Sequence, residues 1–200
     1  MSKFTNSSDE RKWLRKNHLG PDMNLILDLK TKIDAQHLWL THRELSRNAF
    51  LKTEGSTDTN LYFVCRGSLR VYVLDEFEER IIRFGYKDNF IAALDSFISE
   101  KPSDLYIQAI RKTELLVITK ERFMNFIFSS EENTRTWYKI LENLILRQME
   151  RERDILISSP FERYRRVLNR SPQLFQEVPH KYIASYLRMT PETLSRIKKS

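Results

Sequence analysis

The chain has 200 residues, of which 40% are hydrophobic and 30% are charged, a composition typical of globular rather than disordered proteins. No apolar run is long enough to span a membrane, and residues 1–10 lack the apolar stretch of a signal peptide, so we expect a cytoplasmic protein. Cys65 is the only cysteine, which excludes a disulfide framework and a cysteine-ligated zinc or iron–sulfur site. We interpret Cys65 as a small buried residue within a strand.

The net charge of +7 is concentrated near the C-terminus. Residues 158–200 contain nine Lys or Arg and three acidic residues, whereas the rest of the chain is close to neutral. A localised basic segment indicates binding to a polyanion such as nucleic acid. A solvated basic tail has the same composition, so charge alone leaves both interpretations open.

The first part of the chain predicts helix followed by strands. Apolar residues recur at helical spacing through residues 9–38, with an interruption at Gly20-Pro21. The period then changes to two, and Leu69, Val71 and Val73 are expected on one strand face. Many short strands with turns between them favour a closed barrel or jelly roll. Strands are expected at 60–65, 69–74, 80–84, 89–91, 106–110 and 115–119, with a turn at 66–68 and an acidic hairpin loop at 75–79.

Helices are expected over most of the remaining chain. Short helices are predicted at 121–128, 161–169 and 174–177, and the longest helical pattern covers 132–157. Such a long helix either packs on its own domain or pairs with a second copy as a short coiled coil. Its apolar stripe, which Gln148 and Glu152 interrupt, consists of Trp137, Leu141, Leu144, Ile145, Met149 and Leu156.

The last 22 residues predict two helices joined by a tight turn. Pro179 suits the start of the first helix, and Thr190 and Pro191 suit the cap and first turn of the second. This arrangement is a helix-turn-helix. The inward residues are Ile183, Ala184, Leu187, Leu194 and Ile197, and the outward face of the second helix carries Glu192, Ser195, Arg196 and Lys199. Arginine, glutamate and serine are residue types that read base edges.

At these residues the sequence resembles the Crp/Fnr family of bacterial regulators, in particular members common in Bacteroidetes-type bacteria. Residues 178–199 are similar to the family's DNA-binding segment, and residues 61–72 to the strand–glycine–strand part of its cyclic-nucleotide-binding barrel. The resemblance covers roughly residues 20–199. It implies an α+β fold with a jelly-roll sensor barrel and N-terminal helices at 1–130, a dimerisation helix at 131–158 and a helix-turn-helix domain at 159–200.

The resemblance also implies partners and roles. It implies a homodimer on double-stranded DNA, with the two recognition helices in successive major grooves. RNA polymerase and a small-molecule effector are further candidate partners. Glu192, Ser195 and Arg196 are expected to read bases. The full set of expected DNA-binding residues is His180, Lys181, Arg188, Glu192, Thr193, Ser195, Arg196, Lys198 and Lys199, and those outside the base-reading group would mainly contact phosphates.

The sequence departs from cyclic-AMP-binding members at the residues that hold the nucleotide. Those members have Gly-Glu-Leu, whose glutamate holds the ribose, and Arg-Ser-Ala, whose arginine pairs with the phosphate. Ala92-Ala93-Leu94 and Ser103-Asp104-Leu105 stand at these places. Losing the charge-assisted pair and adding a carboxylate costs about 3–5 kcal/mol. We therefore expect a degenerate effector pocket (Phe90, Ala92, Ala93, Leu94, Ser103 and Asp104) that binds neither cyclic AMP nor cyclic GMP.

Two other departures favour a different function class. Arg188 stands where related sequences have a turn glycine, and the sequence ends at Ser200 directly after the second helix, so we expect no full wing. Both would suit a ligand-binding or protein-interaction module with a vestigial helix-turn-helix. We find no Gly-rich phosphate loop, Gly-x-Ser-x-Gly elbow or His-Glu-x-x-His pair, so we do not expect an enzyme. The four histidines are better explained as surface residues than as haem ligands, and no cofactor or metal is expected.

Overall fold

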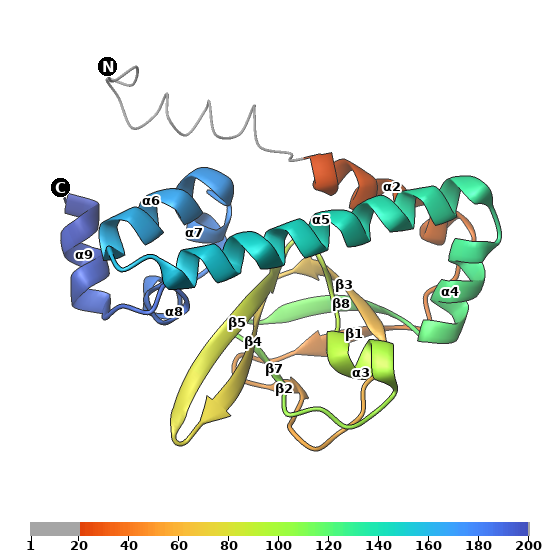
Figure 1. Ribbon diagram of the computed structural model, residues 1–200. Helices are drawn as coiled ribbons and strands as arrows, with labels where there is room; N and C mark the ends of the chain where they lie inside the picture. Colours follow the sequence, from red (N-terminus) through yellow and green to blue (C-terminus); the bar gives the residue numbers. More distant parts are fainter. Residues whose placement is uncertain (1–20, 200) are drawn as a thin grey trace.

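In the computed structural model, which describes residues 21–199, the chain is arranged around one long helix (Figure 1). A β-barrel lies below this helix, two helices lie beside its N-terminal half, and a group of short helices lies at its far end. The first of the two, α2 (Pro21–Ala35), confirms the predicted helix from residue 21 onward. The predicted helical residues 9–20 lie outside the described residues.

The barrel consists of two four-stranded sheets in which all pairs are antiparallel. Its strands are β1 (Thr41–Leu45), β2 (Phe50–Lys52), β3 (Leu61–Arg66), β4 (Ser68–Asp75), β5 (Glu78–Tyr86), β6 (Phe90–Ile91), β7 (Tyr106–Ala109) and β8 (Thr113–Ile118). The strand orders are β1-β8-β3-β6 and β2-β7-β4-β5. Twelve buried side chains, among them Val64, Leu69 and Leu115, fill the space between the sheets. The predicted α+β jelly roll is confirmed.

Three barrel elements carry too little pattern to be predicted from sequence. In β1 only Leu45 is buried, and β2 has three residues, so neither shows an alternation. The short helix α3 (Leu94–Ser99) was also not predicted. The predicted turn at Gly67 is confirmed, since Gly67 has a φ of +88° and a Cβ there would lie 2.4 Å from the Lys112 carbonyl oxygen.

The β4–β5 hairpin differs from the prediction in two details. A β-bulge between Val71 and Tyr72 interrupts the alternation, so Val73 is only partly buried and does not share the inward face of Leu69. The expected loop over 75–79 was too long, because Asp75 pairs with Glu78 and the strands extend almost to the tip.

The long helix α5 (Glu131–Leu156) follows α4 (Lys120–Phe128), and both predictions are confirmed. The Ser130 hydroxyl caps α5 by accepting a hydrogen bond from the Asn133 N–H at 3.1 Å. The predicted single stripe is in fact two adjoining faces. Trp137 and Leu144 face the barrel, whereas Ile145, Met149 and Leu156 are 60%, 46% and 83% exposed. The helix therefore packs on its own domain and also presents an apolar face to the outside.

Four short helices form the C-terminal unit, and the predicted helices at 161–169 and 174–177 are confirmed. They are α6 (Pro160–Arg170), α7 (Leu174–Glu177), α8 (His180–Tyr186) and α9 (Pro191–Lys199). Their core contains Val167, Leu174, Ile183 and Leu194. Ile110 of the barrel belongs to the same cluster, so the C-terminal unit packs directly against the sensor barrel.

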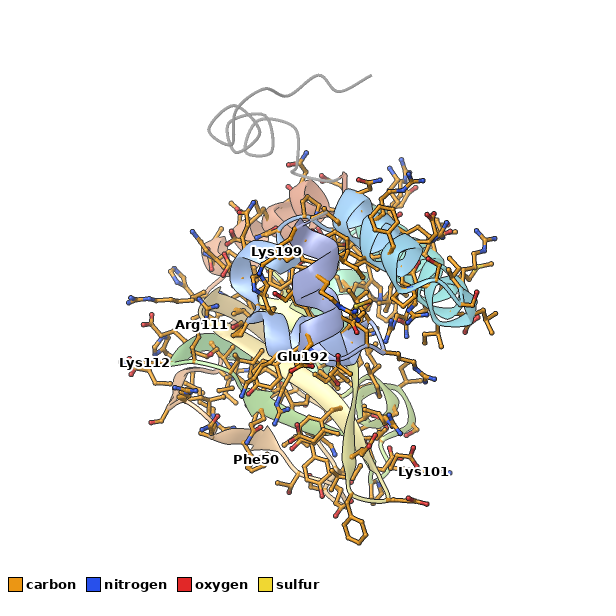
Figure 2. The ribbon with its side chains drawn as sticks, turned by 90° about the vertical axis from the view of Figure 1, so that its left-hand side faces the viewer. Phe50, Lys101, Arg111, Lys112, Glu192 and Lys199 are labelled. Atoms are coloured by element: carbon orange, nitrogen blue, oxygen red, sulfur yellow. The ribbon has the colours of Figure 1, made fainter. Side chains whose placement is uncertain are left out.

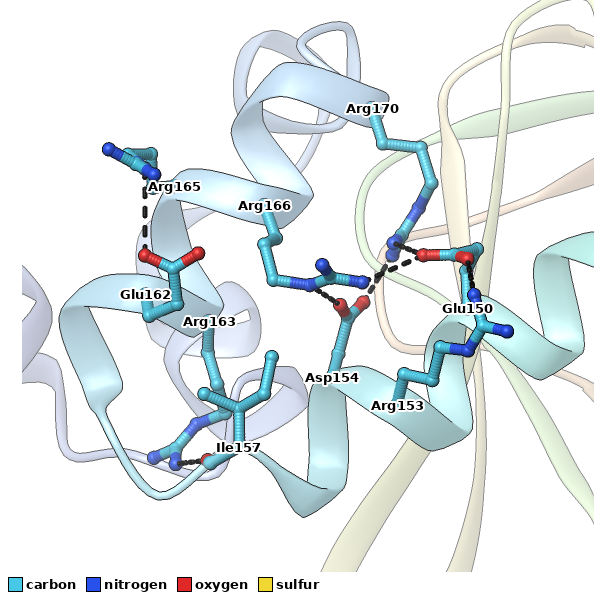
Figure 3. Close-up of polar contacts among 9 residues, drawn as sticks. All are labelled: Glu150, Arg153, Asp154, Ile157, Glu162, Arg163, Arg165, Arg166 and Arg170. Atoms are coloured by element: carbon cyan, nitrogen blue, oxygen red, sulfur yellow. Dashed lines mark hydrogen bonds and ion pairs between the residues drawn. The ribbon is translucent and has the colours of Figure 1, made fainter.

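A buried carboxylate joins α6 to the end of α5 (Figure 3). The Asp154 side chain is 0% exposed, and its two oxygens accept hydrogen bonds from Arg166 Nε, at 3.0 Å, and from Arg170. Glu150, one turn earlier, accepts from Arg166 Nη2 at 2.8 Å. Because residues 157–159 are the only connection between the two helices, these ion pairs set the direction in which the C-terminal unit leaves α5.

We expect Asp154→Asn to lower the free energy of unfolding by about 3 kcal/mol, because a buried ion pair that loses one partner leaves the other charges incompletely compensated. Glu150 still pairs with both arginines, which keeps the loss at this level. Chemical denaturation measures the change. The matched control is Glu152→Gln, an exposed acid on the same helix, which should change stability by less than about 0.5 kcal/mol. Equal effects of the two substitutions would contradict a structural role for Asp154.

Candidate nucleic-acid interface

Helices α8 and α9 pack against each other as the sequence predicts for a helix-turn-helix. Ile183, Ala184, Leu187 and Leu194 are at most 1% exposed and form the contact between the two helices. Ile197 is only partly buried, because it lies in the last turn of α9. The shared core holds α9 firmly by one face and leaves its other face outward.

The turn between the helices depends on two local features. The Thr190 hydroxyl accepts a hydrogen bond from the Thr193 N–H at 3.2 Å and so caps α9, as predicted. Arg188 has a φ of +52°, the left-handed conformation that usually favours glycine. In this conformation the N–H of Arg188 donates to the Ser185 carbonyl oxygen at 3.0 Å and the N–H of Met189 to that of Ala184 at 3.0 Å, which closes α8.

Arg163 stabilises the same turn from α6, and sequence reasoning missed it. Its side chain is 8% exposed. Its guanidinium donates to the carbonyl oxygens of Leu187 at 2.9 Å and Arg188 at 3.1 Å, and to those of Ile157 and Ser158 in the α5–α6 connection. The available signal was its position four residues before Val167, on the buried face of α6.

The outward face of α9 carries the residues predicted to read bases. Glu192, Ser195, Arg196 and Lys199 are all exposed, and Figure 2 shows α9 at the front of the molecule with Glu192 and Lys199 near its two ends. Hydrogen bonds from its own backbone N–H and from the Thr190 hydroxyl lower the pKa of Glu192, so this carboxylate is ionised at neutral pH. Thr193 is partly buried beside Thr190.

The residues predicted to contact phosphates surround this face. Lys181, Arg188, Lys198 and Lys199 are exposed. The Lys198 ammonium lies 2.8 Å from His180 Nε2. Burial, and then the Lys198 charge, lower the pKa of His180, so its ring is neutral at neutral pH. Its Nε2 can then accept a hydrogen bond from the Lys198 ammonium. The structure thus brings all nine predicted residues onto one unit, and their role in DNA binding stays a prediction.

The basic residues of the C-terminal unit divide into inward and outward groups. Arg163, Arg166 and Arg170 are engaged by carbonyl oxygens and carboxylates within the molecule. The charge that faces outward is therefore smaller than composition suggests. Figure 2 adds Arg111 and Lys112, from the β7–β8 turn, to the same side of the molecule as α9. Sequence reasoning missed both because they belong to a barrel turn.

The structure separates the residues predicted to form the effector pocket. Phe90, Ala92 and Leu94 face the helices that cover the barrel, whereas Ala93 is 0% exposed inside the barrel. Ser103 is buried and Asp104 is exposed, in the loop between α3 and β7.

A buried lysine, Lys52 at the end of β2, reaches this loop with its side chain. Its side-chain nitrogen donates to the carbonyl oxygens of Thr53 at 3.0 Å, Ser103 at 3.1 Å and Leu105 at 2.9 Å. Burial lowers the pKa of Lys52, and nearby carboxylates including Asp104 oppose that shift. Because an ammonium has three N–H donors, all of them are used within the protein.

The features relevant to membranes, metals and thiol chemistry are few. No helix within residues 21–199 is long and apolar enough to cross a membrane. In the same range no group of three or more His, Cys, Asp or Glu side chains could hold a metal ion. Cys65 lies in β3 and is partly buried, and burial raises the pKa of its thiol.

Comparison with known proteins assigns the barrel. Residues 42–130 match the family model described as cyclic nucleotide-binding domain. The barrel is therefore similar to a cyclic nucleotide-binding domain. The matched residues extend from β1 to α4. A search among curated proteins gave no match to the sequence.

Solved structures extend the likeness beyond the cyclic nucleotide-binding domain. FixK2 from Bradyrhizobium japonicum has a TM-score of 0.64 at 16% identity, over 80% of this chain and 82% of that chain. A CooA mutant from Carboxydothermus hydrogenoformans has 0.62 at 17%, over 94% and 81%. The c-di-GMP-responsive regulator CLP of Xanthomonas campestris has 0.61 at 15%, over 85% and 90%. These are Crp/Fnr regulators, and likeness at such identity shows a shared fold.

We expect Arg188→Gly to raise the free energy of unfolding by about 0.5–1 kcal/mol, because glycine adopts a φ of +52° without the Cβ strain of arginine. The matched control is Arg188→Ala, which removes the same charge but keeps the Cβ, and should not stabilise the protein. Thermal unfolding compares the two variants. Equal stabilisation by both would mean that charge repulsion, rather than backbone strain, is relieved.

Proposed function

We propose that this protein is a sequence-specific DNA-binding transcription regulator of Crp/Fnr type that does not respond to cyclic AMP. The observation that carries the proposal is the outward face of α9. Leu194 anchors α9 with 1% exposure while Glu192, Ser195, Arg196 and Lys199 are exposed on the opposite side. This arrangement supports the proposal that α9 is a recognition helix, which would enter a major groove.

The charged side chains of the C-terminal unit suit contacts to bases and contacts to phosphates of a DNA duplex. An arginine on such a face pairs bidentately with guanine, and glutamate accepts from the cytosine amine. Lys181, Arg188, Lys198 and Lys199 carry positive charge around α9, where contacts to phosphates would fix the position of the helix without reading sequence.

A homodimer is the second part of the proposal. The outward face of α5 presents Tyr138, Ile145, Met149 and Leu156, which are 58%, 60%, 46% and 83% exposed. Apolar side chains repeated along one helix face support pairing with the same face of a second copy, because that contact removes them from water. Two α9 helices related by a two-fold axis would then face successive major grooves.

The packing inside the barrel supports the proposal that it does not bind a cyclic nucleotide. Its interior holds twelve buried side chains of its own, including that of Ala93. The Lys52 ammonium already donates its three N–H groups to three carbonyl oxygens of the protein. It therefore has no N–H donor left for a phosphate. We therefore propose that DNA binding does not require cyclic AMP or cyclic GMP.

Selection of bound sequences from a random duplex library, with purified protein and no added ligand, tests the function. We expect a palindrome whose half-sites lie about one helical turn, roughly 10 base pairs, apart. We expect the same enrichment when cyclic AMP is added. A single half-site would argue against the dimer, and enrichment only with cyclic AMP would contradict the degenerate pocket. No consensus with or without cell extract would favour an interaction module with a vestigial helix-turn-helix.

Substitutions on α9 separate base reading from phosphate contact. Arg196→Ala should relax preference at one base position, with a loss of discrimination of about 1–3 kcal/mol. Lys199→Ala should weaken binding to all sequences and reduce the slope of log K against log salt by about 1. Fluorescence anisotropy at several salt concentrations measures both. The matched control is Lys139→Ala, at an exposed position in the N-terminal half of α5, away from α9. It should change neither the base preference nor the salt dependence of binding. Identical effects of the two α9 variants would contradict these roles.

A further inference from the structure

Arg70 of β4 is a buried arginine whose place is fixed by the barrel itself. Its side chain is 7% exposed. Its guanidinium pairs in a bidentate manner with the Glu79 carboxylate of β5, with 2.6 Å between Nη2 and Oε1. The side-chain oxygen of Gln108 on β7 accepts from Nε at 3.1 Å and from Nη2 at 2.6 Å. Three neighbouring strands therefore set the position of one guanidinium.

The same guanidinium also contacts the C-terminal unit. Its central carbon lies 4.5 Å from the ring centroid of Tyr72 on β4 and 4.7 Å from that of Tyr182 on α8. Arginine is attracted to aromatic rings by the cation–π interaction, which is stronger where water is excluded. Arg70 therefore joins the barrel to the first helix of the helix-turn-helix.

Glu79 adds a second polar contact at the same place. Its carbonyl oxygen accepts a hydrogen bond from Ser185 Oγ of α8 at 3.4 Å, while its carboxylate holds Arg70. The neighbouring contact between the rings of Tyr186 and Phe84, at 5.4 Å, is aromatic. Because hydrophobic contact is not directional, whereas bidentate ion pairs have a defined geometry, the polar groups around Arg70 define where α8 rests on the barrel.

The C-terminal unit is thereby held at two separate points. One is the end of α5, where Asp154 pairs with Arg166 and Arg170 of α6. The other is Arg70, where α8 lies against β4 and β5 (Figure 1). A rigid body that is held only at its point of attachment can swing about that point, and a second directional contact removes this freedom.

The contact with Arg70 leaves the proposed DNA-binding residues accessible. Tyr182 and Ser185 are partly buried, whereas His180 and Lys181 at the start of α8 are exposed. Figure 2 shows α9 at the front of the molecule, with its outward residues free of the barrel. The docked position of the unit is therefore compatible with binding to a duplex.

We propose that Arg70 is a positioning residue for DNA binding, which through Tyr182 fixes α9 relative to the barrel and so sets the spacing of the two half-sites that a dimer accepts. The inference rests on the proposed function, in which two copies place their α9 helices in successive major grooves. Each added base pair moves a half-site by about 3.4 Å and rotates it by roughly 35°. A unit held at one place accepts one spacing, whereas a unit that swings accepts several.

The test measures affinity for duplexes in which one base pair is inserted or removed between the half-sites of the selected palindrome. For the unaltered protein we expect either change to weaken binding at least tenfold. Arg70→Met removes the guanidinium and should weaken binding to the optimal duplex while reducing that penalty to less than threefold. Tyr182→Leu should act in the same way from α8, and Tyr182→Phe, which keeps the ring, should behave as the unaltered protein does.

The matched control is Arg80→Met. Arg80 lies on β5, is 50% exposed and pairs with Asp75 and Glu78 within the hairpin, so this variant should keep the tenfold spacing penalty. Circular dichroism confirms that each variant is folded, and Tyr182→Leu tests the contact independently if Arg70→Met is unfolded. Weaker binding to all duplexes with the spacing penalty intact would overturn the proposal. A higher affinity of Arg70→Met for the optimal duplex would also overturn it, because the contact would then oppose DNA binding.

A measurement without DNA separates this inference from the proposed function. Spin labels at Lys101→Cys in the barrel and Ser195→Cys in α9, in a Cys65→Ser background and with labelled chains diluted by unlabelled ones, give the distance between the two units by double electron–electron resonance. We expect the distance distribution of Arg70→Met to be at least twice as broad as that of the unaltered protein, and that of Arg80→Met to be unchanged. Equal widths would reject the role of Arg70. Broadening in a protein that binds no duplex would keep the placement of α9 by Arg70 and count against the proposed function alone.

Discussion

The buried carboxylate of Asp154 is the constraint on which the arrangement of the two functional units depends. A charge with 0% side-chain exposure is tolerated only when it is paired, and here Arg166 and Arg170 of α6 both pair with it. Because the paired groups come from α5 and α6, the pairing fixes the angle between the helix that covers the barrel and the unit that carries α9. Apolar packing alone, which is not directional, would leave this angle free over a wider range.

Arginine has two different uses in the last fifth of the chain. Arg163, Arg166 and Arg170 act within the molecule, where their planar donors satisfy carbonyl oxygens and carboxylates at the α5–α6 bend and in the turn of the helix-turn-helix. Arg188 and Arg196 have exposed side chains. The excess positive charge that suggests nucleic acid binding is therefore partly structural, and the part directed outward is concentrated around α9.

The contact between barrel and C-terminal unit is more polar and aromatic than a typical core. Arg70 of β4 lies 4.7 Å from the ring centroid of Tyr182 and pairs with Glu79, and Tyr186 lies between Phe84 and Arg151. Interfaces of this kind are stabilised by a few specific contacts rather than by large apolar area. A cavity of about 230 Å³ between α5 and the barrel borders this contact at Tyr186.

The sequence by itself determined the order of elements, the jelly-roll class, the helix-turn-helix and the faces of α8 and α9, because each depends on local periodicity, capping and turn residues. It could not give β1, β2 and α3, which carry no clear pattern, or the bulge that displaces Val73. The apolar residues of α5 were expected in one stripe, since spacing alone does not say which of them meet the barrel.

Only the tertiary structure decided how the charges are used. Arg163 and Asp154 acquire their roles from partners that lie 24 residues and 12 to 16 residues away, and Lys52 from carbonyl groups about 50 residues away. Arg83 and Arg151 share one cavity although they come from a strand and a distant helix. The free energy of a charged side chain depends on burial and on the groups within a few ångströms of it, and these are set by the packing of distant segments rather than by neighbours in the sequence.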